Sequence, residues 1–164
     1  MSAAPLPGFA DAVAESQVAF RALLDAMARP GTIVRVPAPG GLAGIGATAP
    51  GGLLPPALAT VLLTLVDGTT AVWLDPPLAA EGEIAPWLAF HAGAHTVPDP
   101  GAAAFAVVSD SARMPPAAAF AQGGDEDPDR AATVLVAVNT LEDGPRLRLT
   151  GPGIARTARL APAP

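Results

Sequence analysis

The segment ALATVLLTLVDGTTAVWLDPP, residues 57–77, contains a helix, a turn and a strand in immediate succession. Ala57–Val66 is apolar apart from two threonines and follows two prolines, which favour the first turn of a helix. Asp67-Gly68 predicts a turn, and Ala71–Leu74 predicts a short strand that Pro76-Pro77 ends. An apolar helix that runs directly into an apolar strand is typical of an α/β protein.

On the N-terminal side, residues 9–28 predict another helix. Large apolar side chains recur there at helical spacing and predict one buried face. They are Val13, Phe20, Leu23, Leu24 and Met27. Asp11 is expected to cap the first turn, and Pro30-Gly31 to end the helix. On the other side of this helix, the spacing of Arg21 and Asp25 predicts a surface ion pair.

The remaining chain alternates short apolar segments with turns. Strands are expected at residues 32–36, 104–108, 133–138, 146–150 and 154–160, and helices at 83–92 and 116–121. The strands at 133–138 and 146–150 are expected to pair with each other. Residues 37–56, with five prolines and six glycines, predict a loop, and residues 93–101 predict a second one. This pattern predicts one α/β domain over residues 1–164, with a mixed β-sheet flanked by helices.

Lysine, cysteine and tyrosine are absent from the sequence. Without lysine the chain cannot form a Schiff base or supply the lysine of a Walker-type phosphate loop. Without cysteine it has no thiol nucleophile, cysteine-ligated zinc or iron–sulfur cluster. A GC-rich genome explains these absences without selection on a site.

The overall charge and hydropathy narrow the choice of partners. The formal net charge is −6 and aromatic residues make up 4% of the chain, which argues against nucleic-acid binding. The longest apolar stretch, Ala57–Val66, is far too short to span a membrane, and the N-terminus does not resemble a signal peptide. We therefore expect a cytoplasmic protein that binds neither nucleic acid nor membrane.

The charges are distributed unevenly along the chain. Residues 1–129 hold four of the nine arginines and 13 of the 15 acidic residues, whereas residues 130–164 hold five arginines and two acids. Arg146 and Arg148 alternate on a predicted strand and therefore share a face, and Arg156 and Arg159 follow closely. Guanidinium groups bind phosphate or carboxylate in a bidentate manner. We therefore treat Arg146, Arg148 and Arg156 as candidate phosphate- or partner-binding residues, with a solvated sheet face as the alternative.

His91 and His95 lie four residues apart, and Asp99 follows four residues later. On a continuous helix this spacing places both imidazoles on one face, as in a zinc site. Gly93 and Pro98 argue against such a helix, and the general-base glutamate of the zinc-protease motif is absent. We therefore expect no metal site, but one packed or hydrogen-bonded histidine and one exposed histidine. A stand-alone metal-dependent enzyme that uses His91, His95 and Asp99 is the alternative function.

Four stretches occur in a characteristic order along the chain. They are FRALLDAMARPG (Phe20–Gly31), VLLTLVDGTTAVWL (Val61–Leu74), LAFHAGA (Leu88–Ala94) and RLRLTGPGI (Arg146–Ile154). Together they resemble the PhnH family, the H subunits of the bacterial carbon–phosphorus lyase system. The motif positions expected to be structural are Phe20, Arg21, Pro30, Gly31, Trp73, His91, Gly151 and Gly153. His95 stands where the family usually has proline, so the histidine pair is peculiar to this sequence.

The resemblance implies a fold similar to the large domain of pyridoxal-phosphate-dependent transferases, without that cofactor. It implies a core complex with the G, I and J subunits, in which a phosphonate displaces adenine from Mg-ATP and gives a ribose 1-phosphonate 5-triphosphate. Cleavage of the carbon–phosphorus bond then follows on the iron–sulfur J subunit. The family supplies no catalytic residue for this chain, so the resemblance implies a non-catalytic subunit that binds no cofactor.

Two further expectations concern partners and length. A homodimer and an arginine-lined nucleotide- or phosphonate-binding module remain open alternatives. Family members continue for a few dozen residues beyond the final turn and add another apolar strand. We therefore expect the C-terminal family segment to be missing here, which would leave a sheet edge or an apolar face open.

Overall fold

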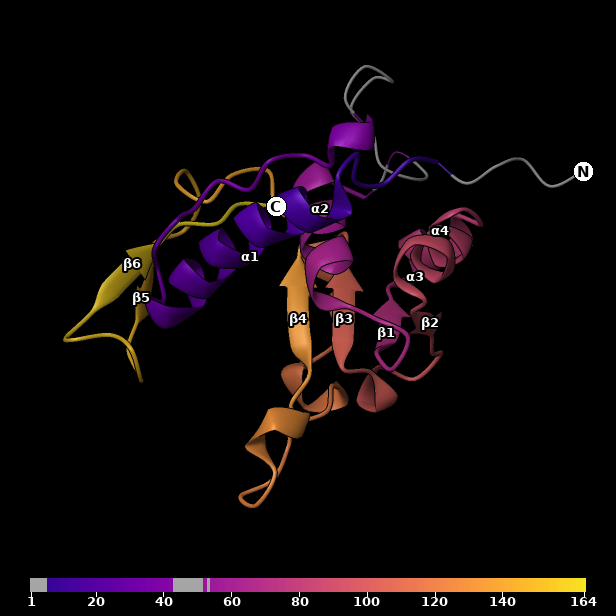
Figure 1. Cartoon of the computed structure of the whole chain (residues 1–164). Coiled ribbons are helices and arrows are strands. Elements are labelled where there is room, and N and C mark those ends of the chain that lie inside the picture. The colour runs from indigo at the N-terminus through magenta and orange to yellow at the C-terminus, as the bar shows by residue number, and fades with distance from the viewer. Residues whose placement is uncertain (1–5, 43–51, 53) are drawn as a thin grey trace, which may run out of the picture.

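The structure is a computed structural model that describes residues 6–42, 52 and 54–164. Four strands form a parallel sheet in the order β2-β1-β3-β4, and β5 and β6 form a separate antiparallel ribbon (Figure 1). The predicted α/β fold, with a sheet flanked by helices, is confirmed. The expectation of one mixed sheet is wrong, because the parallel and antiparallel pairings occupy separate sheets. The elements are α1 (Ala12–Ala28), α2 (Pro56–Leu65), β1 (Ala71–Leu74), α3 (Pro76–Ala80), α4 (Ile84–Ala92), β2 (His95–Thr96), β3 (Phe105–Val108), β4 (Thr133–Val136), β5 (Leu147–Leu149) and β6 (Ala158–Leu160).

The segment 57–77 folds as its sequence predicts. Helix α2 begins at Pro56, and the turn after it is closed by the side chain of Asp67. The Asp67 carboxylate accepts hydrogen bonds from the hydroxyl and the backbone N–H of Thr69, at 2.7 and 2.9 Å, and from the Thr70 hydroxyl at 2.9 Å. These bonds, that of the Thr69 hydroxyl first, lower the pKa of Asp67. The turn thereby delivers the chain directly into β1.

Pro76 and Pro77 end β1 as predicted, but they also begin helix α3, which we did not expect. Proline is tolerated in the first turn of a helix because the N–H groups there have no helical partner. The predicted helix at 83–92 is confirmed as α4. Gly93, in the left-handed conformation at φ 68°, ends it.

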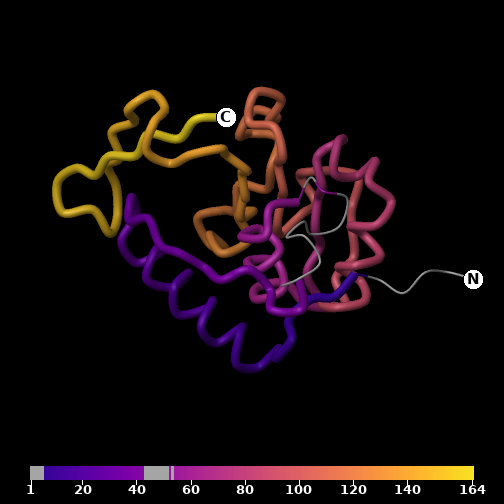
Figure 2. The backbone as a smooth tube through the Cα atoms, turned by 90° about the horizontal axis from the view of Figure 1, so that it is seen from above, coloured from indigo at the N-terminus to yellow at the C-terminus, as the bar shows by residue number. Residues whose placement is uncertain are grey.

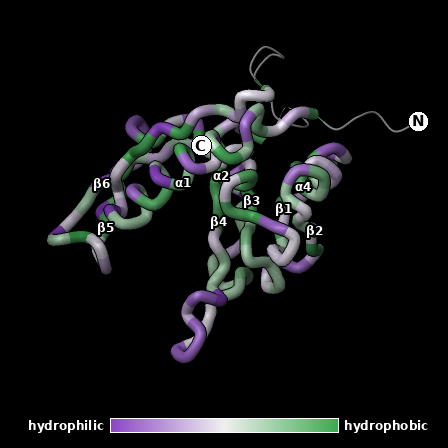
Figure 3. The backbone as a smooth tube through the Cα atoms, viewed as in Figure 1, coloured by the Kyte–Doolittle hydropathy of each residue, from purple (hydrophilic) through white to green (hydrophobic). Residues whose placement is uncertain are grey.

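The parallel sheet separates two apolar clusters. On one face Val72 and Leu74 of β1 pack with residues of α2, α3 and α4. On the other face Trp73 and Val108 pack with Phe120, which follows a short 3₁₀ turn. The rings of Trp73 and Phe120 meet edge to face with centroids 5.9 Å apart. Successive strand residues therefore serve opposite faces, and Figure 3 shows these strands as mainly hydrophobic.

Several strand predictions need correction. Residues 32–36 form no strand, and residues 133–138 and 146–150 do not pair with each other. Instead β4 pairs in parallel with β3, and β5 pairs with β6. The loop predicted at 93–101 contains β2, and the helix predicted at 116–121 is the 3₁₀ turn Ala117–Ala119. Local composition reveals strand propensity, whereas the choice of partner depends on the path of the whole chain.

Helix α1 contradicts the prediction of its buried face. It packs against α2, and its fully buried residue is Ala19. Four of the five residues of the predicted apolar stripe are instead exposed: Val13 69%, Phe20 50%, Leu24 56% and Met27 70%. The fifth, Leu23, is half-buried. Small side chains let α1 approach α2 closely, and the large ones lie roughly a third of a turn away around the helix. Asp11 caps the helix as predicted, since its carboxylate accepts the backbone N–H groups of Val13 and Ala14.

The predicted proline- and glycine-rich loop at 37–56 lies partly outside the described residues, which omit 43–51 and 53. Gly40–Leu42 forms a 3₁₀ turn beside the start of α1. The Glu15 carboxylate accepts a hydrogen bond from the backbone N–H of Gly40 at 2.6 Å. It also accepts the N–H groups of Ala10 and Asp11, each at 2.9 Å.

The pKa of Glu15 reflects two opposing effects. Burial raises it, but the backbone hydrogen bonds to Glu15 outweigh burial and lower the pKa below its usual value. The charged form of Glu15 therefore holds the turn at Gly40 against α1.

Different elements lie on the two sides of the parallel sheet. Viewed from above, α1 and the β5–β6 ribbon occupy one side, and α3 and α4 occupy the other (Figure 2). The parallel sheet lies between them.

Candidate functional site

The carboxyl ends of the parallel strands meet at one edge of the sheet. There β1 continues into Asp75 and β3 into Ser109. The chain leaves β1 toward β2 on one side and leaves β3 toward β4 on the other. In open α/β sheets, such a change in the direction of strand order creates a crevice that commonly binds ligands.

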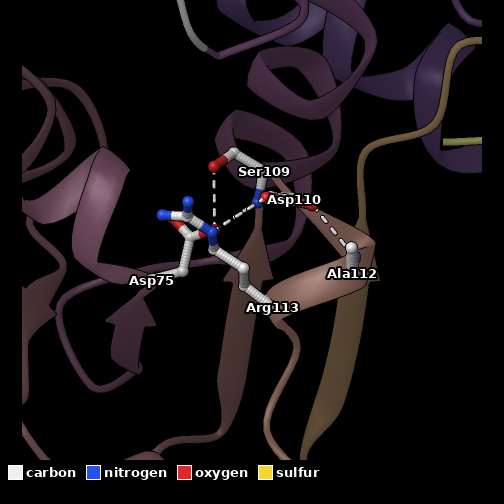
Figure 4. Close-up of polar contacts among 5 residues, drawn as sticks. All are labelled: Asp75, Ser109, Asp110, Ala112 and Arg113. Atoms are coloured by element: carbon white, nitrogen blue, oxygen red, sulfur yellow. Dashed lines mark hydrogen bonds and ion pairs between the residues drawn. The ribbon is translucent and has the colours of Figure 1, made fainter.

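Asp75 connects the two strand ends (Figure 4). It is only 4% exposed, and one of its oxygens accepts the backbone N–H of Ser109 at 2.6 Å and the Ser109 hydroxyl at 2.8 Å. Its other oxygen accepts the N–H of Leu78 at 3.1 Å and caps α3. Both oxygens are thus engaged, so Asp75 holds the crevice in shape rather than offering a free carboxylate to a ligand.

A hollow of about 280 Å³ lies next to this contact. Ser109, Asp110, Ser111 and Asn139 contribute its polar lining. The Asp110 carboxylate accepts the N–H of Ala112 at 2.9 Å, and Asn139 donates to the carbonyl of the final residue. In the described part of the chain no histidine lines this hollow, and the Ser109 hydroxyl donates its hydrogen bond to Asp75.

The sequence analysis did not single out Asp75 or Ser109. The available signal was positional: each polar residue comes directly after a buried strand. Had both strands been assigned to one parallel sheet, their carboxyl ends would have been expected to meet.

The predicted arginine cluster lies on the β5–β6 ribbon. Arg148 stands directly opposite Arg159, and Arg146 precedes β5 at the alternate position that shares their face. Arg156 lies in a bend before β6, outside this register, although it was expected to belong to the cluster. The structure therefore brings together Arg146, Arg148 and Arg159.

The three ion pairs in the described residues involve other arginines. They are Arg29–Asp25, Arg113–Asp110 and Arg130–Asp127. The expected pairing of Arg21 with Asp25 is wrong, because Asp25 pairs with Arg29 one turn further along α1.

His91 and His95 do not lie on one helix face, because α4 ends at Ala92. His95 is exposed on the edge strand β2. The Nε2 atom of His91 lies 2.8 Å from the carbonyl of Leu6, and its ring packs near Trp87. The two histidines thus match the packed and exposed roles expected of them. Across residues 6–42, 52 and 54–164, no three histidine, aspartate or glutamate side chains are grouped as metal ligands.

The family-motif positions occupy different environments. Trp73 is buried, whereas Phe20 and Arg21 are exposed on α1. Gly31 adopts φ 91°, and a Cβ atom there would lie 2.7 Å from that of Ala158 in β6. This close approach docks the end of α1 onto the ribbon.

The turn between β5 and β6 also depends on glycine. Gly151 has φ 146° and Gly153 has φ 78°, a region that side chains disfavour. A Cβ atom on Gly153 would lie 3.0 Å from the ring of Pro30. The two glycine-containing motifs, far apart in the sequence, are therefore in contact.

No helix in the described part of the chain is both long and apolar enough to cross a membrane.

Comparison with known proteins identifies the family. Residues 7–164 match the family described as bacterial phosphonate metabolism protein (PhnH). The chain is also 40% identical, over 154 residues, to the "Alpha-D-ribose 1-methylphosphonate 5-triphosphate synthase subunit PhnH" of Rhizobium meliloti (strain 1021). This alignment covers 94% of the chain and 72% of the relative. The chain therefore belongs to the PhnH family of bacterial phosphonate metabolism proteins.

Proposed function

We propose that this protein is a non-catalytic subunit of an alpha-D-ribose 1-methylphosphonate 5-triphosphate synthase in phosphonate catabolism. Its partners are the G, I and J subunits of the carbon–phosphorus lyase core complex. The relative in Rhizobium meliloti, named as a subunit of that synthase, supports this role.

The exposed stripe on α1 is the observation that carries the proposal. Four large apolar side chains, Val13, Phe20, Leu24 and Met27, lie on one face of the helix and are each at least half exposed. Large apolar side chains that share an exposed helix face indicate a protein–protein contact. Three of the four side chains, Phe20, Leu24 and Met27, lie in the first family motif, and we assign the stripe to contact with a partner subunit.

The contacts of the polar residues at the carboxyl edge of the sheet favour a structural role. Asp75 and Ser109 are bound to each other, and both histidines lie elsewhere. The parallel sheet with covering helices is compatible with kinship to the large domain of pyridoxal-phosphate-dependent transferases. A chain without lysine cannot form the Schiff base on which those enzymes depend.

Co-purification with the G, I and J subunits tests the proposal. We expect the chain to assemble with them at low salt and Phe20→Asp/Leu24→Asp to abolish assembly, because it buries two charges in an apolar contact. Val18→Asp is the matched control, since Val18 is 59% exposed on the same helix but lies away from the stripe. A folded wild-type chain that fails to assemble contradicts the proposal.

The alternative is that a second copy of the chain, rather than a different subunit, contacts this stripe. Size-exclusion chromatography of the isolated protein distinguishes the two, because a homodimer through α1 would be dissociated by Phe20→Asp/Leu24→Asp without any other subunit present.

A further inference from the structure

The β5–β6 ribbon has two chemically different faces. On one face Leu147 lies opposite Leu160, and Leu149 lies opposite Ala158. This apolar face meets the end of α1 at Gly31. The ribbon is thereby held in place by its apolar side, and its other side is turned away from that contact.

The second face carries three arginines. Arg148 and Arg159 are directly opposite each other, and Arg146 shares their face. Like charges at opposed positions of an antiparallel pair destabilise it. In the described part of the chain, no carboxylate forms an ion pair with any of the three. Their mutual repulsion is therefore not compensated by these residues, and an external anion would relieve it.

A hollow of about 360 Å³ adjoins this face. Arg146, just before β5, and Arg159, in β6, line it together, and Ile33 and Leu141 provide apolar walls. Its volume falls in the range of small-molecule sites. Glu142 also lines the hollow without forming an ion pair to either arginine. The space thus combines apolar surface and one carboxylate with two cations that form no ion pair to any carboxylate in the described residues.

We propose that this arginine face binds a small phosphate-bearing anion, seated between Arg146 and Arg159. The planar guanidinium fork matches phosphate oxygens in a bidentate manner, and a second guanidinium opposite it can hold a second phosphate group. The apolar walls suit the organic part of such a molecule. A protein partner would not need a hollow of this size, so the geometry favours a small ligand over an acidic surface. The inference concerns the isolated chain and does not depend on synthase membership.

Isothermal titration of the full chain with inorganic tripolyphosphate at low salt tests this site. We expect Arg146→Ala/Arg159→Ala to weaken binding by about tenfold or more, since it removes two charge-assisted contacts. Arg130→Ala is the matched control, because Arg130 is exposed and ion-paired with Asp127 away from the ribbon. The affinity of the Arg130→Ala variant for tripolyphosphate is expected to stay within about twofold of the wild-type value. Glu142→Gln is expected to tighten binding by roughly two- to fivefold, because it removes a negative charge from the wall.

Thermal unfolding of each variant verifies that it is folded. Three results overturn the proposal: no binding to the folded wild-type chain at millimolar tripolyphosphate, an equal loss in Arg130→Ala, or tighter binding of a polyglutamate peptide than of tripolyphosphate. The last result would assign the arginine face to an acidic protein partner instead.

Discussion

The Asp75 carboxylate, at the end of β1, accepts two hydrogen bonds from Ser109, at the end of β3. The bond from the Ser109 hydroxyl is 2.8 Å long and the bond from its backbone N–H is 2.6 Å long. The two strands are parallel neighbours, so this contact joins their carboxyl ends. It lies where the chain leaves β1 toward β2 on one side and leaves β3 toward β4 on the other. The two residues therefore determine the shape of the crevice at the carboxyl edge.

Replacement of Asp75 is expected to destabilise the protein in a graded manner. Asp75→Ala leaves the partly buried N–H of Ser109 without its acceptor and should lower the free energy of unfolding by about 2 kcal/mol. Asp75→Asn keeps one acceptor oxygen and should cost less, and Ser109→Ala, which removes only the hydroxyl, should cost about 1 kcal/mol. Urea denaturation measures all three, and an Asp75→Ala variant as stable as Ser109→Ala would contradict this account.

Glu15 is expected to make stability depend on pH. Its folded pKa is lowered, so its contribution is present above the unfolded pKa and is lost as pH falls through the folded pKa. Glu15→Gln should therefore lower the free energy of unfolding by about 1 kcal/mol at pH 7. The deficit should begin to shrink as the pH falls below the unfolded pKa of about 4.3, and it should disappear once the pH lies below the lowered folded pKa.

Urea denaturation at neutral and acidic pH compares Glu15→Gln with wild type. Glu126→Gln, in the exposed loop before Pro128–Arg130, controls for loss of one negative charge. A deficit for Glu15→Gln that stays constant across this pH range argues against a charged acceptor at Gly40.

The opposed arginines of the ribbon are expected to lower stability. Arg159→Glu converts the repulsion with Arg148 into attraction and should raise the free energy of unfolding by roughly 0.5 kcal/mol at low salt. The gain should fade in high salt, because both groups are exposed and screened. Arg148→Glu/Arg159→Glu restores a like-charge pair and should return to wild-type stability. Thermal unfolding at low and high salt compares both variants with the wild-type protein. A loss of stability in Arg159→Glu at low salt would contradict this prediction.

The sequence predicted the elements better than their arrangement. The helix–turn–strand unit at 57–77, the cap at Asp11 and the helix ending at Gly93 follow from local chemistry and are confirmed. Parallel pairing of β4 with β3 joins residues from separate parts of the chain, and no local pattern specifies it. Residues 32–36 are rich in β-branched side chains and were predicted as a strand, but they pair with no described strand and form none.

The stripe on α1 shows where sequence reasoning about burial fails. Helical spacing correctly groups Phe20, Leu24 and Met27 on one face, but spacing cannot tell what covers that face. The arginine cluster was likewise predicted only in part. Alternation correctly joined Arg146 to Arg148, whereas the choice of Arg159 over Arg156 required the register of β6.

Methionine oxidation tests the central claim, burial of the α1 stripe by a partner subunit, most directly. Met27 is 70% exposed on the stripe, and Met114, which lies outside α1, is 40% exposed. Hydrogen peroxide converts accessible methionine to its sulfoxide, and mass spectrometry measures the rate at each position. In the complex with the G, I and J subunits we predict that oxidation of Met27 slows by about tenfold or more relative to the isolated chain while Met114 keeps its rate, because contact excludes the oxidant. Oxidation of Met27 at the same rate in the assembled complex and in the isolated chain would contradict the account.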